Sequence, residues 1–297
     1  LETIAIATAK IRAGMGECFI AGGVENMSQI PMEGYKLALN YEVADKHPDY
    51  IIGMGLTAEA VAKKYNISRE AQDEFALRSH QLSSAARDRG FFAEEITPVS
   101  LTEISVKNDK RTETNFTVKE DEGIRKETTL EALSALKPVF ANHGTVTAGN
   151  ASQTSDGAGF VLVMSERIMN ALGLQPVGRI IACSVAGVDP LYMGIGPCAA
   201  IPKALLAAGK SLAEISLIEL NEAFASQSLA VIREAGLDPS IVNVNGGAIA
   251  LGHPLGCSGA RLTMTLLHEL KSRKQSFGIV TACVGGGQGI AAVIESY

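Results

Sequence analysis

The sequence of 297 residues contains no tryptophan and only five cysteines, and neither its apolar nor its basic residues gather into long runs. Because the cysteines are odd in number and none belongs to a C-x-x-C pair, we expect neither a disulfide framework nor a zinc site. The same pattern favours a reducing compartment. The absence of an apolar run of about 18 residues predicts no membrane span. The absence of a Lys/Arg-rich run, with a formal net charge of −6, argues against a nucleic-acid partner.

The residues that are present fit a large globular protein. Apolar residues make up 46% of the sequence and charged residues 20%, and the length allows one large core or two in tandem. The apolar opening at residues 1–9 lacks the basic segment and cleavage site of a secretory signal, so we interpret it as a core helix. No capping residue precedes this helix, which suggests that the sequence starts within a domain.

Helical and strand patterns alternate along most of the sequence, which predicts a mixed sheet covered by helices. Helices are expected at residues 1–13, 166–172, 201–208, 223–235 and 262–272, and strands at 18–21, 159–164, 177–186, 215–220, 277–282 and 290–296. Residues 28–141 differ, with more charge and frequent Pro and Gly. We expect helices there at residues 58–65 and 69–90, the second capped by Ser68, and a polar hairpin or loop at 107–114. We interpret this segment as a separate, mostly exposed layer.

Three polar or reactive residues stand at the ends of apolar segments near the C-terminus. Cys283 follows an apolar strand and precedes a glycine run, where a reactive thiol can meet free backbone N–H groups. His253 lies between Gly252 and Pro254, with room around its ring. Asn221 ends another apolar strand and can either cap the following helix or serve an oxyanion. Each has an ordinary alternative as a buried or capping residue, and Glu222 can act through the helix dipole.

Three motifs resemble, in order, the C-terminal signatures of the thiolase family: Asn-Glu-Ala-Phe-Ala at 221–225, Asn-Gly-Gly-Ala-Ile-Ala-Leu-Gly-His-Pro-Leu-Gly at 245–256 and Cys-Val-Gly-Gly-Gly at 283–287. The resemblance continues through Ala-Gly-Gly-Val-Glu-Asn-Met-Ser at 21–28, Gly-Leu-Thr-Ala-Glu at 55–59, Asp-Glu-Gly-Ile-Arg at 121–125 and Thr-Ala-Gly-Asn-Ala-Ser at 147–152. It therefore covers essentially the whole sequence, and the motifs together are highly specific.

The resemblance implies the thiolase fold, a five-layered α-β-α-β-α sandwich of two related halves with an inserted loop layer. Residues 1–27 and 142–172 would be the remainder of an incomplete N-terminal half, residues 28–141 the loop domain, and residues 173–297 the C-terminal half. The family also implies a homodimer or homotetramer and a possible partner subunit of β-oxidation. It implies a cytoplasmic location in a bacterium and a peroxisomal or mitochondrial one in a eukaryote.

The family's roles carry over by position. His253 resembles the general base that activates the nucleophilic thiol, and Cys283 resembles the cysteine that moves the proton at the α-carbon. Asn221 resembles the residue that positions an oxyanion-hole water, and the backbone N–H of Gly285 would serve the other oxyanion hole. The residues that resemble coenzyme A contacts are Arg125 at the nucleotide, Ala148 and Ser152 at the pantetheine, and Met54 and Phe224 in the apolar lining. Coenzyme A is implied as a substrate, with no metal and no permanently bound cofactor.

The sequence departs from the family at its start. The family's nucleophilic cysteine, in a Cys-x-Gly pattern, stands about three residues before the position of Leu1, and none of the five cysteines replaces it by motif. We therefore expect an active enzyme of which this sequence is a part, and we expect the part alone to be inactive.

Details of the motifs bear on the substrate. Gly53 precedes Met54-Gly55, where biosynthetic thiolases carry a histidine, and this favours the degradative 3-ketoacyl-CoA thiolases of fatty-acid β-oxidation. The expected reaction is thiolytic cleavage of 3-ketoacyl-CoA to acetyl-CoA and a shortened acyl-CoA. One alternative is a biosynthetic acetyl-CoA acetyltransferase that forms acetoacetyl-CoA. An alternative of another class is a non-catalytic subunit for CoA binding or oligomerisation.

Overall fold

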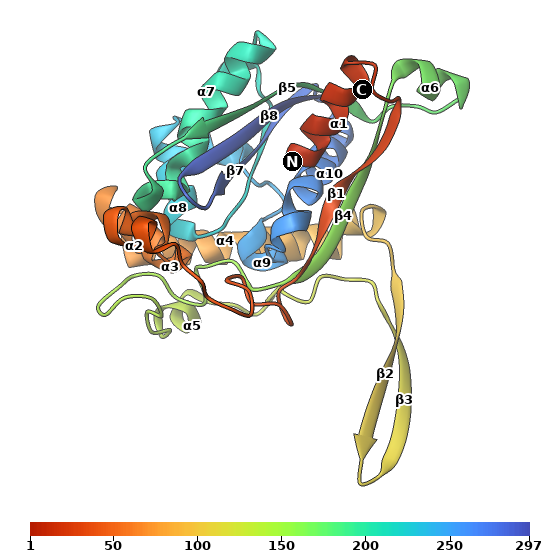
Figure 1. The fold of residues 1–297 in the computed structure, drawn as a ribbon. Coiled ribbons are helices and arrows are strands. Elements are labelled where there is room, and N and C mark those ends of the chain that lie inside the picture. The colour runs from red at the N-terminus through yellow and green to blue at the C-terminus, as the bar shows by residue number, and fades with distance from the viewer.

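The computed structural model describes residues 1–297, and its main body contains two sheets (Figure 1). The larger sheet has the strand order β5 (Gly178–Gly187), β8 (Gln288–Ser296), β7 (Phe277–Val284) and β6 (Leu217–Leu220). Strand β8 is antiparallel to both β5 and β7, whereas β6 runs parallel to β7. The smaller sheet is the antiparallel pair β1 (Cys18–Asn26) and β4 (Asp156–Met164). A mixed sheet is therefore confirmed.

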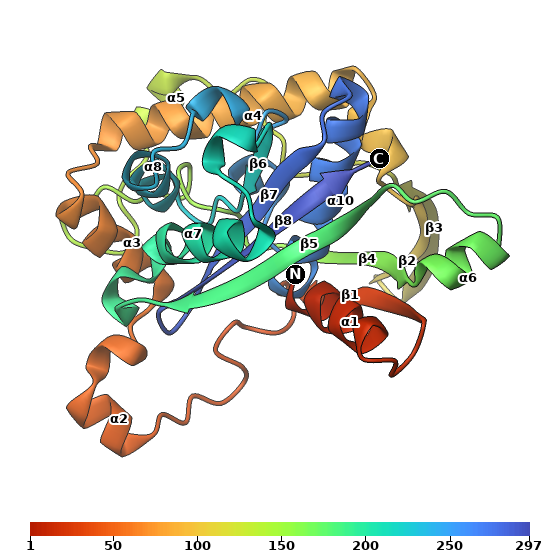
Figure 2. The same cartoon turned by 90° about the horizontal axis from the view of Figure 1, so that it is seen from above.

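Helices cover and separate the two sheets. Helix α7 (Gly196–Ala208) packs on β5, β7 and β8. Helix α10 (Leu255–Arg273) contacts β6, β7 and β8 of the larger sheet and β1 and β4 of the smaller one, so it lies between them. Helix α1 (Glu2–Arg12) packs on β1 and β4 and also reaches β5 (Figure 2). The layers thus alternate between helix and sheet.

A second group of helices packs beside these layers. Helices α3 (Met54–Lys64) and α4 (Arg69–Asp88) both contact α8 (Ala225–Glu234), and α4 also contacts α9 (Ala248–Leu251). Ser68 accepts a hydrogen bond from the backbone N–H of Ala71 and so caps α4, as the sequence predicted. Three short helices complete the set, namely α2 (Tyr41–Lys46), α5 (Leu130–Ser134) and α6 (Glu166–Ala171). Five short 3-10 helices are η1 (Pro48–Tyr50), η2 (Phe91–Glu94), η3 (Pro190–Ile195), η4 (Leu212–Glu214) and η5 (Pro239–Ile241).

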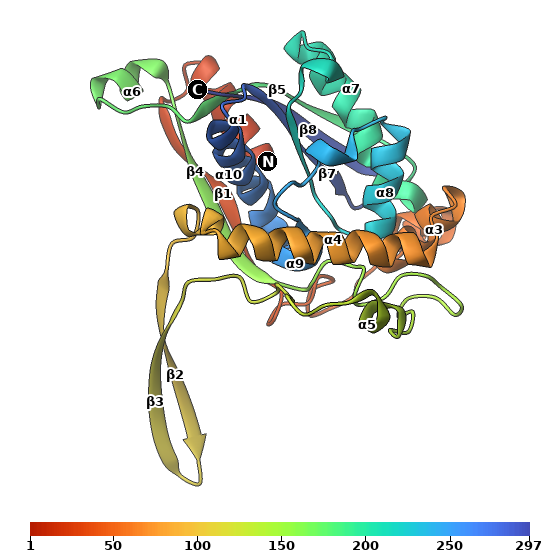
Figure 3. The same ribbon diagram turned by 180° about the vertical axis from the view of Figure 1, so that it is seen from behind.

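A long hairpin extends away from this body (Figures 1 and 3). It consists of β2 (Val99–Lys107) and β3 (Lys110–Val118), and nearly all of its residues are exposed. Asn108 and Asp109 form the two-residue turn with φ of 50° and 59°, a conformation that Asn and Asp tolerate better than most residues. The sequence predicted a hairpin or loop only at residues 107–114, so the hairpin is longer than expected.

The main hydrophobic core lies between the larger sheet and the helices beside it. Its fully buried members include Leu220 on β6, Ile279 on β7 and Val231 on α8, each 0% exposed. A second cluster joins the other face of this sheet to α10 through Leu262, which is also fully buried. Because both faces are covered, β6 reads as a continuous apolar run apart from Glu219 rather than as an alternating strand.

The start of α10 differs from the sequence prediction because of glycine. Helix α10 begins at Leu255, seven residues before the expected start at residue 262, and includes Gly256 and Gly259. A Cβ on Gly256 would lie 2.8 Å from the carbonyl oxygen of Val24, and one on Gly259 would lie 1.9 Å from the backbone nitrogen of Leu1. These glycines lower helix propensity but allow α10 to approach β1 and α1 closely. The spacing of apolar residues in the sequence does not reveal that these glycines allow such close packing.

One helical stretch, Pro190–Ala208, is long and apolar enough to cross a membrane by length and composition. It combines η3 with α7 and is kinked at Tyr192. The α7 residues Ala200, Ile201 and Ala204 are buried in the main core against the larger sheet. Its apolar composition is therefore accounted for by core packing.

The face of the smaller sheet includes an exposed apolar group. Ile20 and Leu162 are paired across β1 and β4 and are 77% and 55% exposed. Val24 and Phe160, at 67% and 50% exposed, extend the same group.

Candidate active site

The parallel pairing of β6 and β7 brings Asn221 and Cys283 to one edge of the larger sheet. Leu220, the last residue of β6, pairs with Thr281 of β7, and the backbone N–H of Asn221 donates to the carbonyl of Thr281 over 2.9 Å. Cys283 lies two residues further along β7. The carboxyl ends of parallel strands are common positions for binding sites because side chains leave the sheet there together.

His253 reaches this edge from the short segment between α9 and α10. Its Nε2 lies 3.2 Å from Nδ2 of Asn221, and its Nδ1 lies 2.6 Å from Oγ of Ser258. Gly252, with φ of 90°, makes the turn that a residue with a side chain could adopt only with strain. Burial, and then the nearby Arg261 guanidinium, lower the pKa of His253 to about 4. The imidazole is therefore neutral at pH 7 and can accept a proton.

Cys283 lies in an apolar cluster at the same edge. It packs with Met193 and Ala223, and Met54 and Phe224 border the cluster. Burial raises the pKa of the Cys283 thiol to about 12. The group is consequently a protonated thiol at neutral pH and not a thiolate nucleophile.

The residues after Cys283 form a glycine turn between β7 and β8, in which Gly285 is exposed and Gly287 is buried. The N–H of Gly285 makes no hydrogen bond within the protein, so it is available to a ligand. A Cβ on Gly285 would lie 3.5 Å from Sδ of Met54, which places this turn beside the N-terminus of α3. Backbone donors in such a fixed turn suit a developing oxyanion.

Asn221 has one polar atom without a protein partner. Its side chain is 0% exposed, and its Oδ1 accepts no hydrogen bond from the protein. Buried amides are normally paired with protein groups or with ordered water. Helix α8 begins at Ala225 with Phe224 as its N-cap and no side-chain cap, so the capping role considered for Asn221 is wrong.

The expected pantetheine contacts lie next to the loop that follows Asn221. The N–H of Ser152 donates to the carbonyl of Ala223 over 3.0 Å, and Ala151 bridges to Phe224. Ala148, in the same loop, is exposed. Phe224 in turn makes an edge-to-face contact with Phe140, with ring centroids 6.1 Å apart. Phe140 was not singled out from the sequence because it belongs to no motif there.

Arg125 is held by its backbone while its side chain remains exposed. Its N–H donates to Nδ1 of His80 on α4 over 3.2 Å. Gln153 joins the same segment to α9, because its Nε2 donates to the carbonyls of Gly123 and Ile249, both over 3.0 Å. This placement leaves the guanidinium free to meet a ligand at the surface.

Glu222 supports the site through its buried carboxylate, which accepts at the N-terminus of α9 rather than at that of α8, the helix expected to follow it. Its buried carboxylate accepts from Ser79 Oγ at 2.6 Å, Asn243 Nδ2 at 2.8 Å and the Ile249 N–H at 3.2 Å. Burial raises its pKa, and these three donors oppose the rise. Together they tie α4 and the end of β6 to the segment that leads to His253. Neither Ser79 nor Asn243 belongs to a pattern that marks it in the sequence.

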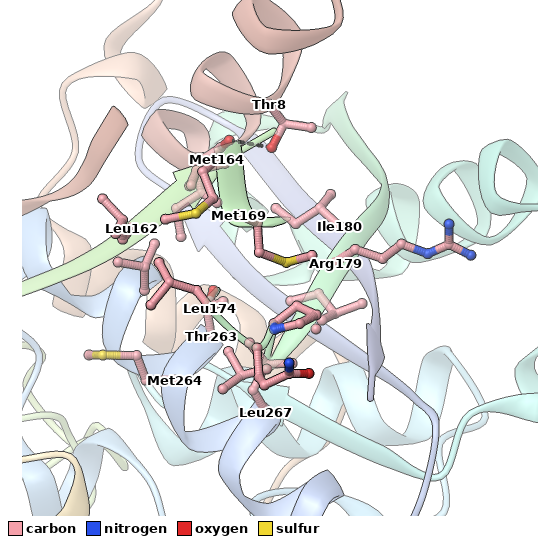
Figure 4. A pocket seen from close by; sticks show the side chains of 18 of the residues that line it. Thr8, Leu162, Met164, Met169, Leu174, Arg179, Ile180, Thr263, Met264 and Leu267 are labelled. Carbon is pink, nitrogen blue, oxygen red and sulfur yellow. Dashed lines mark hydrogen bonds between the residues drawn. The ribbon is translucent and has the colours of Figure 1, made fainter. Parts of the chain in front are cut away.

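A large cavity lies elsewhere and is lined by none of these residues. Its volume is about 1240 Å³, and Thr8, Met169, Ile180 and Leu267 are among the side chains that line it (Figure 4). It lies among α1, β4, β5 and α10. No group of three or more His, Cys, Asp or Glu side chains could hold a metal ion, and the expectation of a metal-free site stays a prediction.

Comparison with known proteins matches this fold and these motifs to one family. The model of the thiolase N-terminal domain matches residues 1–167, and that of the thiolase C-terminal domain matches residues 174–296. A 3-ketoacyl-CoA thiolase of Bacillus subtilis is 53% identical over 99% of the chain and 76% of its own length. An acetyl-CoA acetyltransferase of Escherichia coli is 47% identical with the same coverage. The human mitochondrial 3-ketoacyl-CoA thiolase structure superposes with a TM-score of 0.88 at 44% identity, covering all of this chain and 76% of that one.

These relatives are acyltransferase enzymes, and their fold is the fold described here. The chain belongs to the thiolase family. The expected thiolase fold and enzyme class are thereby confirmed. The division into residues 1–27 with 142–172, 28–141 and 173–297 stays a prediction, as do the roles of the individual site residues.

Proposed function

We propose that the protein catalyses thiolytic cleavage of 3-ketoacyl-CoA to acetyl-CoA and a shortened acyl-CoA. The observation that carries the proposal is the pairing of a neutral His253 with Asn221 at the strand edge that also carries the protonated thiol of Cys283. The resting protonation states, a neutral imidazole and a protonated thiol, suit a reaction that takes one proton and delivers another. The 53% identical relative named 3-ketoacyl-CoA thiolase supports the degradative direction.

In the first half-reaction a cysteine thiol gives its proton to His253 and its sulfur attacks the 3-keto carbon. The bond between C2 and C3 breaks, and its electron pair forms the enolate of acetyl-CoA. Cys283 donates its proton to C2 and becomes a thiolate, which releases acetyl-CoA and leaves an acyl-enzyme. Transfer of the proton from His253 to the Cys283 thiolate then restores both groups.

In the second half-reaction His253 takes the proton of a coenzyme A thiol. The coenzyme A thiolate attacks the acyl-enzyme carbonyl, the enzyme's sulfur leaves, and His253 returns the proton to it. Both half-reactions place negative charge on an oxygen, which fixed donors stabilise. We assign one such site to His253 with a water held by Asn221, and the other to the N–H of Gly285. The unpartnered Oδ1 of Asn221 supports the water.

The nucleophile in this scheme is the cysteine that the resemblance places just before Leu1. The position of Leu1 supports this assignment, because its backbone nitrogen abuts Gly259 in the first turns of α10. Ser258, the neighbour of Gly259, is hydrogen-bonded to His253. A chain entering α1 therefore passes the N-terminal end of α10, which follows His253.

Coenzyme A would lie across the loops that meet at this edge. We assign the nucleotide to the exposed guanidinium of Arg125, the pantetheine to Ala148 and Ser152, and the reactive end to the apolar surface of Met54 and Phe224. The contacts of Gln153 and His80 support this arrangement because they fix the Arg125 segment against the site. A thiolase structure from Saccharomyces cerevisiae is described as dimeric, with a TM-score of 0.89, and we propose that this protein is also a homo-oligomer.

The first measurement is the reading frame upstream of Leu1 in the source gene. A Cys-x-Gly directly before Leu1 supports the scheme, and the absence of a cysteine there overturns it in favour of a CoA-binding role without catalysis. The second is thiolysis by the protein as translated from its gene, with 3-ketoacyl-CoA substrates of increasing chain length. Turnover of long and short substrates supports the degradative enzyme. Activity confined to acetoacetyl-CoA supports the acetyl-CoA acetyltransferase, which the 47% identical Escherichia coli relative favours.

A further inference from the structure

Ser258 makes two short contacts beside the proposed base. It lies in the first turns of α10, is 4% exposed, and its Oγ lies 2.6 Å from Nδ1 of His253. The same Oγ donates to the carbonyl oxygen of Pro254, the residue after His253, over 2.9 Å. The hydroxyl therefore connects the imidazole to the backbone at the start of the helix that follows it.

The two contacts together indicate which nitrogen of His253 carries the hydrogen. A serine hydroxyl has one hydrogen, and a carbonyl oxygen can only accept; that of Pro254 also accepts the N–H groups of Cys257 and Ser258. When the hydroxyl hydrogen is directed to Pro254, Oγ presents only lone pairs to Nδ1, and Nδ1 is then the protonated nitrogen. Nε2 then keeps its lone pair and accepts from Nδ2 of Asn221 at 3.2 Å. The hydrogen-bond network, rather than an observed hydrogen, makes this assignment.

We propose that Ser258 is a positioning residue that holds His253 in the Nδ1–H tautomer, with Nε2 free to accept the proton of the attacking thiol. The proposal rests on the proposed function, in which His253 is the general base. The wrong tautomer would point an N–H at the thiol and could not take its proton. When Nε2 is protonated, the imidazolium donates a charge-assisted hydrogen bond to Oγ, so Ser258 also stabilises the state that forms during the reaction.

The first test reads the tautomer directly by long-range nitrogen–proton NMR of the resting protein, with the His253 signals assigned by comparison with His253→Gln. The unmutated protein is expected to show the Nδ1–H form. Ser258→Ala is expected to lose that form or to mix it with the Nε2–H form. A neutral His253 with its hydrogen on Nε2 in the unmutated protein would overturn the proposal, as would an unchanged tautomer in Ser258→Ala.

The second test follows thiolysis by the protein as translated from its gene. Loss of the charge-assisted bond in Ser258→Ala is expected to lower kcat by about tenfold to a hundredfold, with little change in KM. Ser258→Thr keeps the hydroxyl and should restore most of the rate. Threonine makes the same contact to the carbonyl four residues earlier at Thr8 and Thr263 of this protein, at 2.9 and 2.8 Å. Equal kcat in the unmutated protein and Ser258→Ala would contradict the proposal.

Thr263→Val is the matched control. Thr263 lies on the same helix, is 3% exposed and makes the same kind of bond, but it does not contact His253. It should therefore leave both the tautomer and kcat unchanged, and a loss as large as that of Ser258→Ala would assign the effect to α10 rather than to His253. If Ser258→Ala does not fold, the tautomers of the unmutated protein and of Ser258→Thr still decide the proposal. Absence of thiolysis with the predicted tautomer present would contradict the proposed function only.

Discussion

Acid should loosen the link between α4 and the proposed nucleotide segment through His80. This histidine is 4% exposed, and its Nδ1 accepts the N–H of Arg125. Burial, and then the Arg125 guanidinium, lower the pKa of His80 from 6.5 to about 4. Because the folded protein binds this proton less readily than the unfolded chain, the stabilisation is complete above pH 6.5. It is lost progressively as the pH falls from 6.5 towards 4.

The size of the effect follows from these two pKa values. Between about pH 7.5 and pH 5 the linkage relation gives a loss of about 2 kcal/mol in the free energy of unfolding from His80 alone. His80→Gln removes the titration but keeps an acceptor near Arg125. We expect this variant to be less stable at neutral pH. Its free energy of unfolding should fall by about 2 kcal/mol less than that of the unmutated protein between the two pH values.

Urea denaturation followed by circular dichroism at both pH values measures the free energy of unfolding of each protein, and so its change with pH. His143→Gln is the matched control, because His143 is exposed and makes no side-chain hydrogen bond. It should leave the pH dependence of stability unchanged. Equal pH dependence in the unmutated protein and His80→Gln would refute the linkage argument.

Two further predictions concern the acid residue and the smaller sheet. Cys283→Ala should lower the rate of thiolysis by the protein as translated about 10²- to 10⁴-fold with the fold retained, because the proton donor is lost, whereas Cys18→Ala, at an exposed cysteine, should leave the rate unchanged. Steady-state thiolysis measures both variants, and a fully active Cys283→Ala would exclude the assigned role. Ile20→Thr with Leu162→Thr should reduce the binding of a fluorescent apolar dye to residues 1–297, because these side chains are 77% and 55% exposed and adjacent. The same double change on the exposed hairpin, Val106→Thr with Ile104→Thr, is the control, and an equal reduction there would mean that the smaller sheet is not the main dye site.

The sequence predicted the elements that carry the site well because their signals are local. An apolar run ending at Asn221 and another ending near Cys283 are strands at the expected places. The spatial meeting of these ends could be expected from parallel pairing, but the approach of His253 could not. It depends on the start of α10 at Leu255. The first turns of this helix contain the glycines that weakened the helical pattern.

The supporting residues were invisible for a different reason. Ser79, Asn243 and Ser258 are ordinary polar residues in the sequence, and each acts through a partner far along the chain or through the precise start of a helix. Ser79 bonds to Glu222 across 143 positions. Periodicity reports which face of an element is apolar, but it does not report which buried polar group will find a partner on that face. Residues of this kind emerge only once tertiary contacts are known.

The opposite pKa changes of His253 and Cys283 have the same main cause. They agree with the proposed roles of His253 as the proton acceptor and Cys283 as the proton donor. Burial disfavours any charge, so it keeps the imidazole unprotonated and the thiol protonated. A cysteine that a histidine activates as a nucleophile has a lowered pKa, because the thiolate is paired with an imidazolium. Cys283 shows the reverse, with a pKa raised to about 12, and its neighbours are the apolar side chains of Met193 and Ala223. This environment supports the proposed role of Cys283 as the proton donor to carbon, with a different thiol as the proposed nucleophile.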